Sequence, residues 1–82
     1  MTEARAQATT VVDALGLHCP MPVIELAKAV EAADVGGEVE VWSDDPTSRV
    51  DIPVWARLRG HELTGTRELD GGGQAYVVRR TI

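Results

Sequence analysis

The chain alternates between segments in which apolar residues recur with the period of a strand and segments in which they recur with the period of a helix. Residues 38–42 (EVEVW) alternate strictly between acidic and apolar side chains, which predicts a strand with one buried face. From Val23 onward, apolar residues recur at helical spacing, which predicts an amphipathic helix that the glycine pair 36–37 ends. The β-branched and apolar run 9–15 (TTVVDAL) predicts a strand before that helix.

A second helix is predicted between residues 47 and 59, and its starting point depends on Pro53. A proline inside a helix costs about 3 kcal/mol, because it removes a hydrogen bond and clashes with the preceding turn. We therefore expect Asp51 to be the N-cap, which places Pro53 in the first turn, and Gly60 to end the helix. The apolar residues expected to form its buried stripe are Val54, Trp55 and Leu58.

The remainder of the chain predicts a β-hairpin. Residues 61–69 and 74–81 are two β-like runs, and the segment 70–73 (DGGG) between them accepts the positive φ angles of a tight turn. The order β-α-β-α-β-β predicts an α+β fold, a two-layer α/β sandwich with two helices packed on one face of a mixed four-stranded sheet. A single domain is expected over residues 1–82, with the polar residues 1–8 flexible.

Charge and size argue against several classes of function. A net charge of -5 is unfavourable for contact with a phosphate backbone, so no direct nucleic-acid partner is expected. No apolar run approaches the ~18 residues that span a bilayer, and the polar N-terminal stretch does not resemble a signal peptide, so no membrane association is expected. A single cysteine suits a reducing cytoplasm. So small a domain is expected to act at its surface, on something that a partner presents.

The only cysteine lies in residues 13–22 (DALGLHCPMP), at the entrance of the first predicted helix. There the sulfur of Cys19 is near the positive end of the helix macrodipole and the free N–H groups of the first turn, and both favour the thiolate. The dipole is expected to lower the thiol pKa by less than about one unit, towards the range in which thiols exchange sulfur readily. Pro20 and Pro22 stiffen the backbone beside the thiol and remove two N–H donors, so a phosphate site is not expected.

These residues also allow interpretations other than a reactive thiol. A lone cysteine is commonly a small buried apolar residue, but the polar turn around Cys19 favours exposure. A thioredoxin-like dithiol is excluded, because Pro22 occupies the position of the second cysteine. His18 either assists thiolate formation or is a solvent-exposed turn residue. No metal site is expected, since three or four convergent ligands cannot be assembled around His18 and His61.

The segment 15–22 (LGLHCPMP) resembles the Cys-Pro-x-Pro signature of the TusA/SirA/YedF family of sulfurtransferases. Further segments resemble the second conserved block of that family at the same spacing, and the likeness covers residues 10–80; they are 43–46 (SDDP), 51–53 (DIP) and 60–63 (GHEL). The resemblance implies that Cys19 is the catalytic residue. It would accept sulfane sulfur as a persulfide and relay it to an acceptor protein, with no cofactor.

The resemblance also assigns roles to the surroundings of Cys19. Asp13, Gly16, Pro20 and Pro22 are expected to shape the loop and the helix entrance, and together with His18 and Met21 they are the expected binding residues. Met21 stands where better-known members of the family often carry a polar or acidic residue, so the surface beside the sulfur is expected to be more apolar. The later block contains no second cysteine.

Partners follow from the same resemblance. It implies a sulfur donor protein, either a cysteine desulfurase or rhodanese-like, and a sulfur acceptor protein, with this chain acting as a monomer. The pathway stays open among tRNA thiolation, a thio-cofactor such as the molybdenum cofactor, and sulfur oxidation, and selenium handling would use the same cysteine. The alternative is a non-catalytic module that regulates a partner and docks through the sheet or the Pro-x-Pro edge, in which case Trp42, Met21 and Leu17 matter more than the sulfur.

Overall fold

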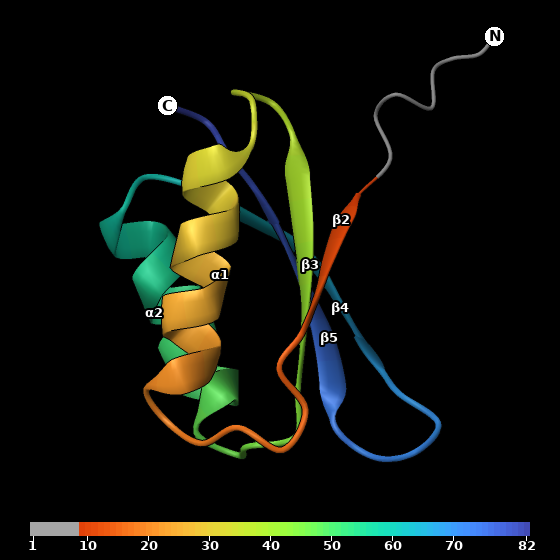
Figure 1. Ribbon diagram of the computed structural model, residues 1–82. Helices are drawn as coiled ribbons and strands as arrows, with labels where there is room; N and C mark the ends of the chain where they lie inside the picture. Colours follow the sequence, from red (N-terminus) through yellow and green to blue (C-terminus); the bar gives the residue numbers. More distant parts are fainter. Residues whose placement is uncertain (1–8) are drawn as a thin grey trace, which may run out of the picture.

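The computed structural model describes residues 9–82, so the flexibility expected for residues 1–8 lies outside the described residues. The element order β-α-β-α-β-β is confirmed (Figure 1). The elements are β2 (Thr10–Asp13), α1 (Met21–Ala32), β3 (Glu38–Ser43), α2 (Ser48–Leu58), β4 (Glu62–Glu68) and β5 (Gln74–Arg79). Their bounds differ by a few residues from those predicted; β2 ends at Asp13 and α1 ends at Ala32, ahead of the glycine pair.

The four strands form one mixed sheet in the order β2-β3-β5-β4. β2 and β3 run parallel, while β5 pairs antiparallel with both β3 and β4. The parallel pair requires a crossover connection, which α1 supplies. Both helices lie on the same side of the sheet, as Figure 1 shows. The predicted two-layer α+β fold is therefore confirmed.

The core lies between the helices and the sheet. Alternation along β3 buries Val39 and Val41 against the helices, and it directs Glu40 to the opposite face. The other large members of the core are Leu26, Val30, Ile52, Tyr76 and Val78. On the opposite face Glu40 accepts hydrogen bonds from Trp42 and Arg67, each at 2.6 Å. One sheet face thus carries the core and the other carries polar pairs.

The predicted start of α2 at Asp51 is wrong. The helix begins at Ser48, with Thr47 as its N-cap, and contains Pro53 in its interior. The Oδ1 atom of Asp45 accepts hydrogen bonds from the N–H and the hydroxyl of Thr47, each at 3.0 Å. The buried hydroxyl of Ser48 bonds that of Ser43 at 2.7 Å. These contacts stabilise the earlier start of the helix and offset the loss of the one backbone hydrogen bond that Pro53 cannot form.

The predicted buried stripe of α2 is also largely wrong. The buried residues of the helix are Ser48, Ile52 and Ala56, spaced four apart. Of the predicted stripe, Val54 is 42% and Leu58 79% exposed. Ser48, bonded to Ser43, belongs to the helix, and the face that it shares with Ile52 and the small Ala56 packs on the core, so Val54 and Leu58 face outward. None of the helices within residues 9–82 has the length and apolarity needed to cross a bilayer.

Candidate functional site

The candidate site is built from two loops that follow the parallel strands β2 and β3. Because the carboxyl ends of adjacent parallel strands lie side by side, the loop after Asp13 meets the loop after Ser43. The carboxylate of Asp44 accepts a hydrogen bond from the N–H of Gly16 at 3.1 Å, and that of Asp45 accepts one from the N–H of Cys19 at 2.6 Å. The second loop therefore holds the backbone of the first at two points.

The loop after β2 is shaped by residues that the sequence singled out. The side chain of Asp13 accepts a hydrogen bond from the N–H of Leu15 at 3.0 Å, which closes a tight turn. Gly16 follows with a φ of +83°, a conformation that a residue with a Cβ rarely adopts. Buried Ala14 donates its N–H to the carbonyl of Trp42 at 2.9 Å, so the loop begins firmly attached to β3.

The same loop runs directly into α1. Pro20 is the N-cap, Met21 is the first helical residue, and Pro22 is buried against the core. The Cys19–Pro20 peptide bond is cis. The N–H of Met21 donates to the carbonyl of His18 at 2.8 Å. The expectation that the thiol stands beside the helix N-cap is confirmed, and Met21 itself is 38% exposed next to it.

The thiol of Cys19 is exposed and donates a hydrogen bond to Oδ2 of Asp51 on α2, at 3.2 Å. This hydrogen bond is the main reason that the thiol pKa is raised above its ordinary value; slight burial and the negative charges of Asp51 and Asp45 add to it, and the Thr47 hydroxyl opposes it. The expectation that the helix terminus lowers this pKa is therefore wrong. A carboxylate in contact with the sulfur outweighs the modest effect of the dipole.

His18 is exposed beside the thiol, but the hydrogen bonds of residues 9–82 give the sulfur Asp51 as its partner and none from the imidazole. The pKa of the Asp45 carboxyl is lowered, first by the N–H of Thr47 and then by the N–H of Cys19, with a smaller effect from the charge of His18. No group of three or more His, Cys, Asp or Glu side chains within the described part of the chain is arranged to hold a metal ion.

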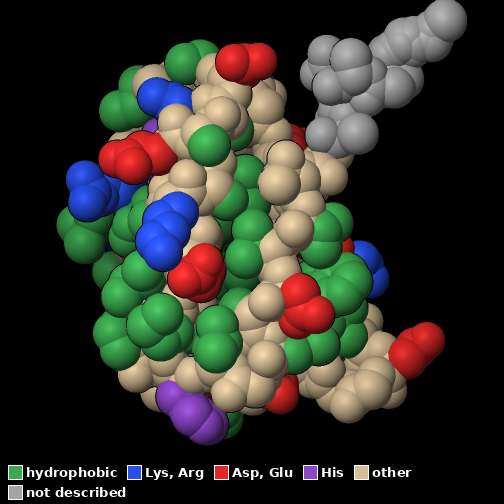
Figure 2. Space-filling view, in the orientation of Figure 1, with side chains coloured by type: hydrophobic (Ala, Val, Ile, Leu, Met, Phe, Trp, Pro, Cys, Tyr) green, Lys and Arg blue, Asp and Glu red, His purple; other side chains and the backbone are tan. Residues whose placement is uncertain are grey.

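Asp44, Asp45 and Asp51 were not among the predicted site residues, although all three contact the loop of Cys19. The available signal was their place in the segments 43–46 and 51–53, which resemble the second block of the family. Among the residues near the start of α1, Leu15 and Ile24 are each 40% exposed. Figure 2 shows hydrophobic side chains gathered over this end of the helical layer. The surface around the thiol thus combines carboxylates with apolar groups.

A cysteine at a helix entrance, held by carboxylates of a second loop, can be compared with known proteins. The sequence profile of the family described as "Sulfurtransferase TusA" matches residues 10–80. The chain belongs to the TusA family. It is 41% identical over 80 residues to a protein named sulfur carrier protein TusA from Pseudomonas entomophila, covering 98% of this chain and 96% of that one.

Two further TusA relatives agree with this assignment. A protein of Archaeoglobus fulgidus named putative sulfur carrier protein is 41% identical over 68 residues, which cover 83% of this chain and 88% of the relative. The crystal structure of a SirA-like protein from Desulfitobacterium hafniense superposes with a TM-score of 0.78 at 32% identity, covering 90% of this chain and all of the other. Sequence and fold therefore place the chain in the same family.

Proposed function

We propose that the chain carries sulfane sulfur as a persulfide on Cys19 and relays it from a donor protein to an acceptor protein. Membership of the TusA family gives it a role in sulfur transfer. The observation that carries the finer proposal is the exposed sulfur of Cys19, the only thiol of the chain, at the start of α1. An exposed thiol on a fixed backbone is reachable by the thiol and persulfide groups of other proteins.

The proposed step conserves atoms and electrons without an oxidant. The Cys19 sulfur attacks the outer sulfur of a donor persulfide, R–S–SH. A new S–S bond forms on Cys19 while the S–S bond of the donor breaks. The thiolate R–S⁻ leaves and takes up the proton that the Cys19 thiol gave up, so that the products are Cys19–S–SH and R–SH. Attack of an acceptor thiolate on the outer sulfur of Cys19–S–SH repeats the same exchange.

Two carboxylates would have separate roles in this step. Asp51 accepts the hydrogen of the resting thiol, so it is the nearest group to which the proton can move as the sulfur attacks. Asp45 holds the backbone of Cys19 through its N–H and does not contact the sulfur. Asp45 is therefore a positioning residue, which keeps the thiol at the mouth of the two loops.

The proposed partners follow from the chemistry. A cysteine desulfurase or a rhodanese-like protein presents the sulfur that Cys19 would accept, and a second protein receives it. The chain would act as a monomer in the cytoplasm, where a lone thiol stays reduced. His18 and Met21, both exposed beside the thiol, would belong to the surface that these partners contact.

Intact-protein mass spectrometry after incubation with a cysteine desulfurase and cysteine, or with a rhodanese and thiosulfate, tests the proposal. The wild type should gain the mass of one sulfur atom, and a reductant should remove it. Cys19→Ser should gain nothing. Circular dichroism shows whether this variant is folded, and a folded Cys19→Ser is the control for unspecific addition. A wild type that gains no sulfur from either donor or from inorganic polysulfide would refute the persulfide carrier.

A further inference from the structure

The outward face of α2 carries a row of exposed apolar side chains. Val50, Val54 and Leu58 are spaced four apart, so they line up along the helix, and they are 64%, 42% and 79% exposed. The helix buries Ser48, Ile52 and Ala56 instead, on the side that faces the core. Apolar side chains in a continuous row on a small protein's surface are a feature of interaction sites.

Two further rows border the apolar row, one basic and one of mixed character. On one side are Arg49 and Arg57, again at helical spacing. On the other side Asp51, which holds the thiol of Cys19, is followed four residues later by Trp55 and eight residues later by Arg59. The row that contains Asp51 therefore starts beside the sulfur, and the apolar row next to it runs along the helix for about 12 Å, at 1.5 Å per residue.

The cations of this helix differ from the others within residues 9–82. Arg67 and Arg79 pair with glutamates at 2.6 Å, Lys28 pairs with Glu25, and Arg80 binds backbone carbonyls at the end of α1. Arg49, Arg57 and Arg59 make no ion pair within the described part of the chain, although the chain has a net charge of -5. Among residues 9–82, positive charge that forms no ion pair is thus concentrated on α2 and its end.

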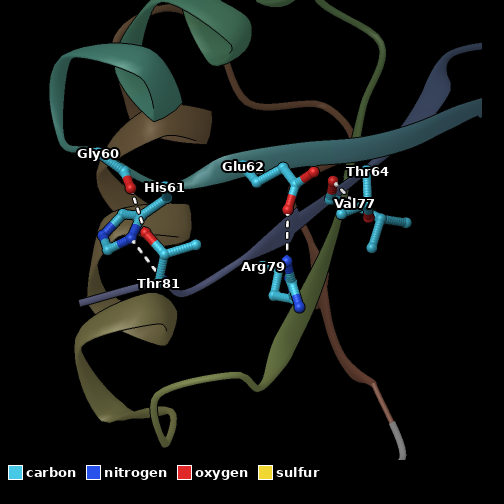
Figure 3. Close-up of polar contacts among 7 residues, drawn as sticks. All are labelled: Gly60, His61, Glu62, Thr64, Val77, Arg79 and Thr81. Carbon is cyan, nitrogen blue, oxygen red and sulfur yellow. Dashed lines mark hydrogen bonds and ion pairs between the residues drawn. The ribbon is translucent and has the colours of Figure 1, made fainter.

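A hollow of about 380 Å³ lies at the far end of this surface, between α1 and α2. Trp55, Arg59, His61 and Ile82 line it together with residues of α1. Figure 3 shows how its wall is fixed: Thr81 donates its N–H to the His61 ring at 3.3 Å and its hydroxyl to the carbonyl of Gly60. The pKa of His61 is lowered, first by burial and then by the charges of Arg80 and Arg59. The hollow therefore has an apolar lining with charged side chains of both signs, Arg59 and Arg80 together with Glu31.

We infer that this α2 face docks the protein that exchanges sulfur with Cys19, and that this partner presents an apolar segment bordered by carboxylates. The identity of the occupant follows from charge complementarity, because unpaired arginines border an apolar centre on an otherwise acidic chain. An apolar centre does not suit a phosphate backbone, whereas an amphipathic acidic helix of about two turns fits its length. The inference rests on the proposed function, since the partner is defined by its exchange with Cys19.

Two sulfur sources separate docking from chemistry. Inorganic polysulfide needs no docking surface, whereas a purified cysteine desulfurase with cysteine needs one. The docking variants are Arg49→Gln with Arg57→Gln, and Leu58→Gln. Their matched controls are Arg67→Gln with Arg79→Gln on the open sheet face, and Val35→Gln, whose side chain is 64% exposed in the turn after α1. The second-order rate of sulfur addition to Cys19 is measured by intact-protein mass spectrometry.

Both docking variants should be loaded about tenfold or more slowly by the desulfurase, while the controls keep the wild-type rate and polysulfide loads all of them equally. Salt at about 1 M, which shortens the Debye length to about 3 Å, should slow the desulfurase but not polysulfide. Equal rates in docking variants and controls would overturn the inference, as would a wild type loaded by polysulfide but by neither the desulfurase nor a rhodanese with thiosulfate.

Two other outcomes point elsewhere. A wild type that polysulfide fails to load would refute the proposed function itself. The docking surface can then still be tested by calorimetry, which measures binding of the desulfurase to Cys19→Ser with and without Leu58→Gln. Sedimentation that shows a dimer of the wild type and a monomer of Leu58→Gln would make a second copy of the chain the occupant, which contradicts the inference.

Discussion

At the scale of single residues, the contact between Asp51 and the Cys19 thiol decides the electrostatics of the site. A thiol at a helix entrance is expected to ionise more readily, yet the carboxylate 3.2 Å from the sulfur reverses the direction and raises its pKa. At rest the protonated form is favoured. The reactive form then depends on a change in what surrounds Asp51, such as the arrival of a partner.

Asp51→Asn should lower the pKa of Cys19, because it removes both the charge and the strongest acceptor for the thiol hydrogen while keeping the size of the side chain. The pH dependence of alkylation by iodoacetamide reports this pKa: its midpoint should move to lower pH. Asp34→Asn, at an exposed position beyond the end of α1, is the matched control. A midpoint that stays in place or rises in Asp51→Asn would show that Asp51 does not control the thiol.

At the scale of elements, what could be predicted from the sequence is what depends on local periodicity. The strict alternation of residues 38–42 and the helical spacing after Val23 gave β3 and α1 correctly, and the Pro-x-Pro entrance placed Cys19 beside the N-cap. The position of Asp51 could not be predicted in this way. It depends on the start of α2, which is stabilised by a hydrogen bond between the hydroxyls of Ser43, at the end of β3, and Ser48, at the start of α2.

That early start also explains why the apolar face of α2 was assigned to the core. With Asp51 as N-cap, the helix would bury its largest apolar residues. The N-cap is instead Thr47, four residues earlier, and in this helix Asp51 contacts Cys19 while Leu58 is 79% exposed. The wrong N-cap therefore accounts for two missed features, the contact of Asp51 with the thiol and the exposed apolar row of α2. The contacts that Ser43 makes with Asp45 and Ser48 contain this information.

The β4–β5 hairpin supports the site through one close approach. Gly73 has a φ of +87°, and a Cβ there would lie 2.9 Å from the carbonyl oxygen of Ser43, which directly precedes the loop of Asp44 and Asp45. Gly72 has a φ of +102° but open space around it. Both glycines avoid the same backbone strain, and only Gly73 also avoids a clash.

Gly73→Ala should therefore lower the free energy of unfolding by about 1–3 kcal/mol more than Gly72→Ala, because overpacking is added to a similar cost of positive φ. Urea denaturation of the two variants and the wild type measures the difference. Equal losses would show that β3 moves aside freely. The desulfurase assay on Gly73→Ala then shows whether displacing Ser43 also slows sulfur addition.

At the scale of the whole molecule, Asp45 couples the order of the site to pH. Its pKa is lowered in the folded chain by the N–H groups of Thr47 and Cys19. A carboxyl with a lowered folded pKa contributes stability above its unfolded pKa, and this contribution is lost as the pH falls through the folded value. Acid should thus loosen the attachment of the Cys19 loop to the β3–α2 loop.

The wild type should be more stable than Asp45→Asn at neutral pH, and the difference should shrink as the pH falls from the ordinary range of aspartate through the folded pKa of Asp45. Denaturation at a series of pH values measures this dependence. Asp70→Asn, in the exposed hairpin turn, is the control for a general effect of charge. A difference between wild type and Asp45→Asn that is constant with pH would contradict the role of the carboxylate.

The exposure of Cys19 affects how long a sulfur atom bound to it would remain there. Enzymes that hold reactive intermediates exclude water from them, whereas this thiol stands at the surface with one carboxylate beside it. Any abundant small thiol in the surrounding solution could remove sulfur placed there. Such a protein is suited to rapid transfer of sulfur between two partners and not to storage. The fraction of sulfur that reaches the acceptor would depend on how soon the protein meets the acceptor after it has met the donor.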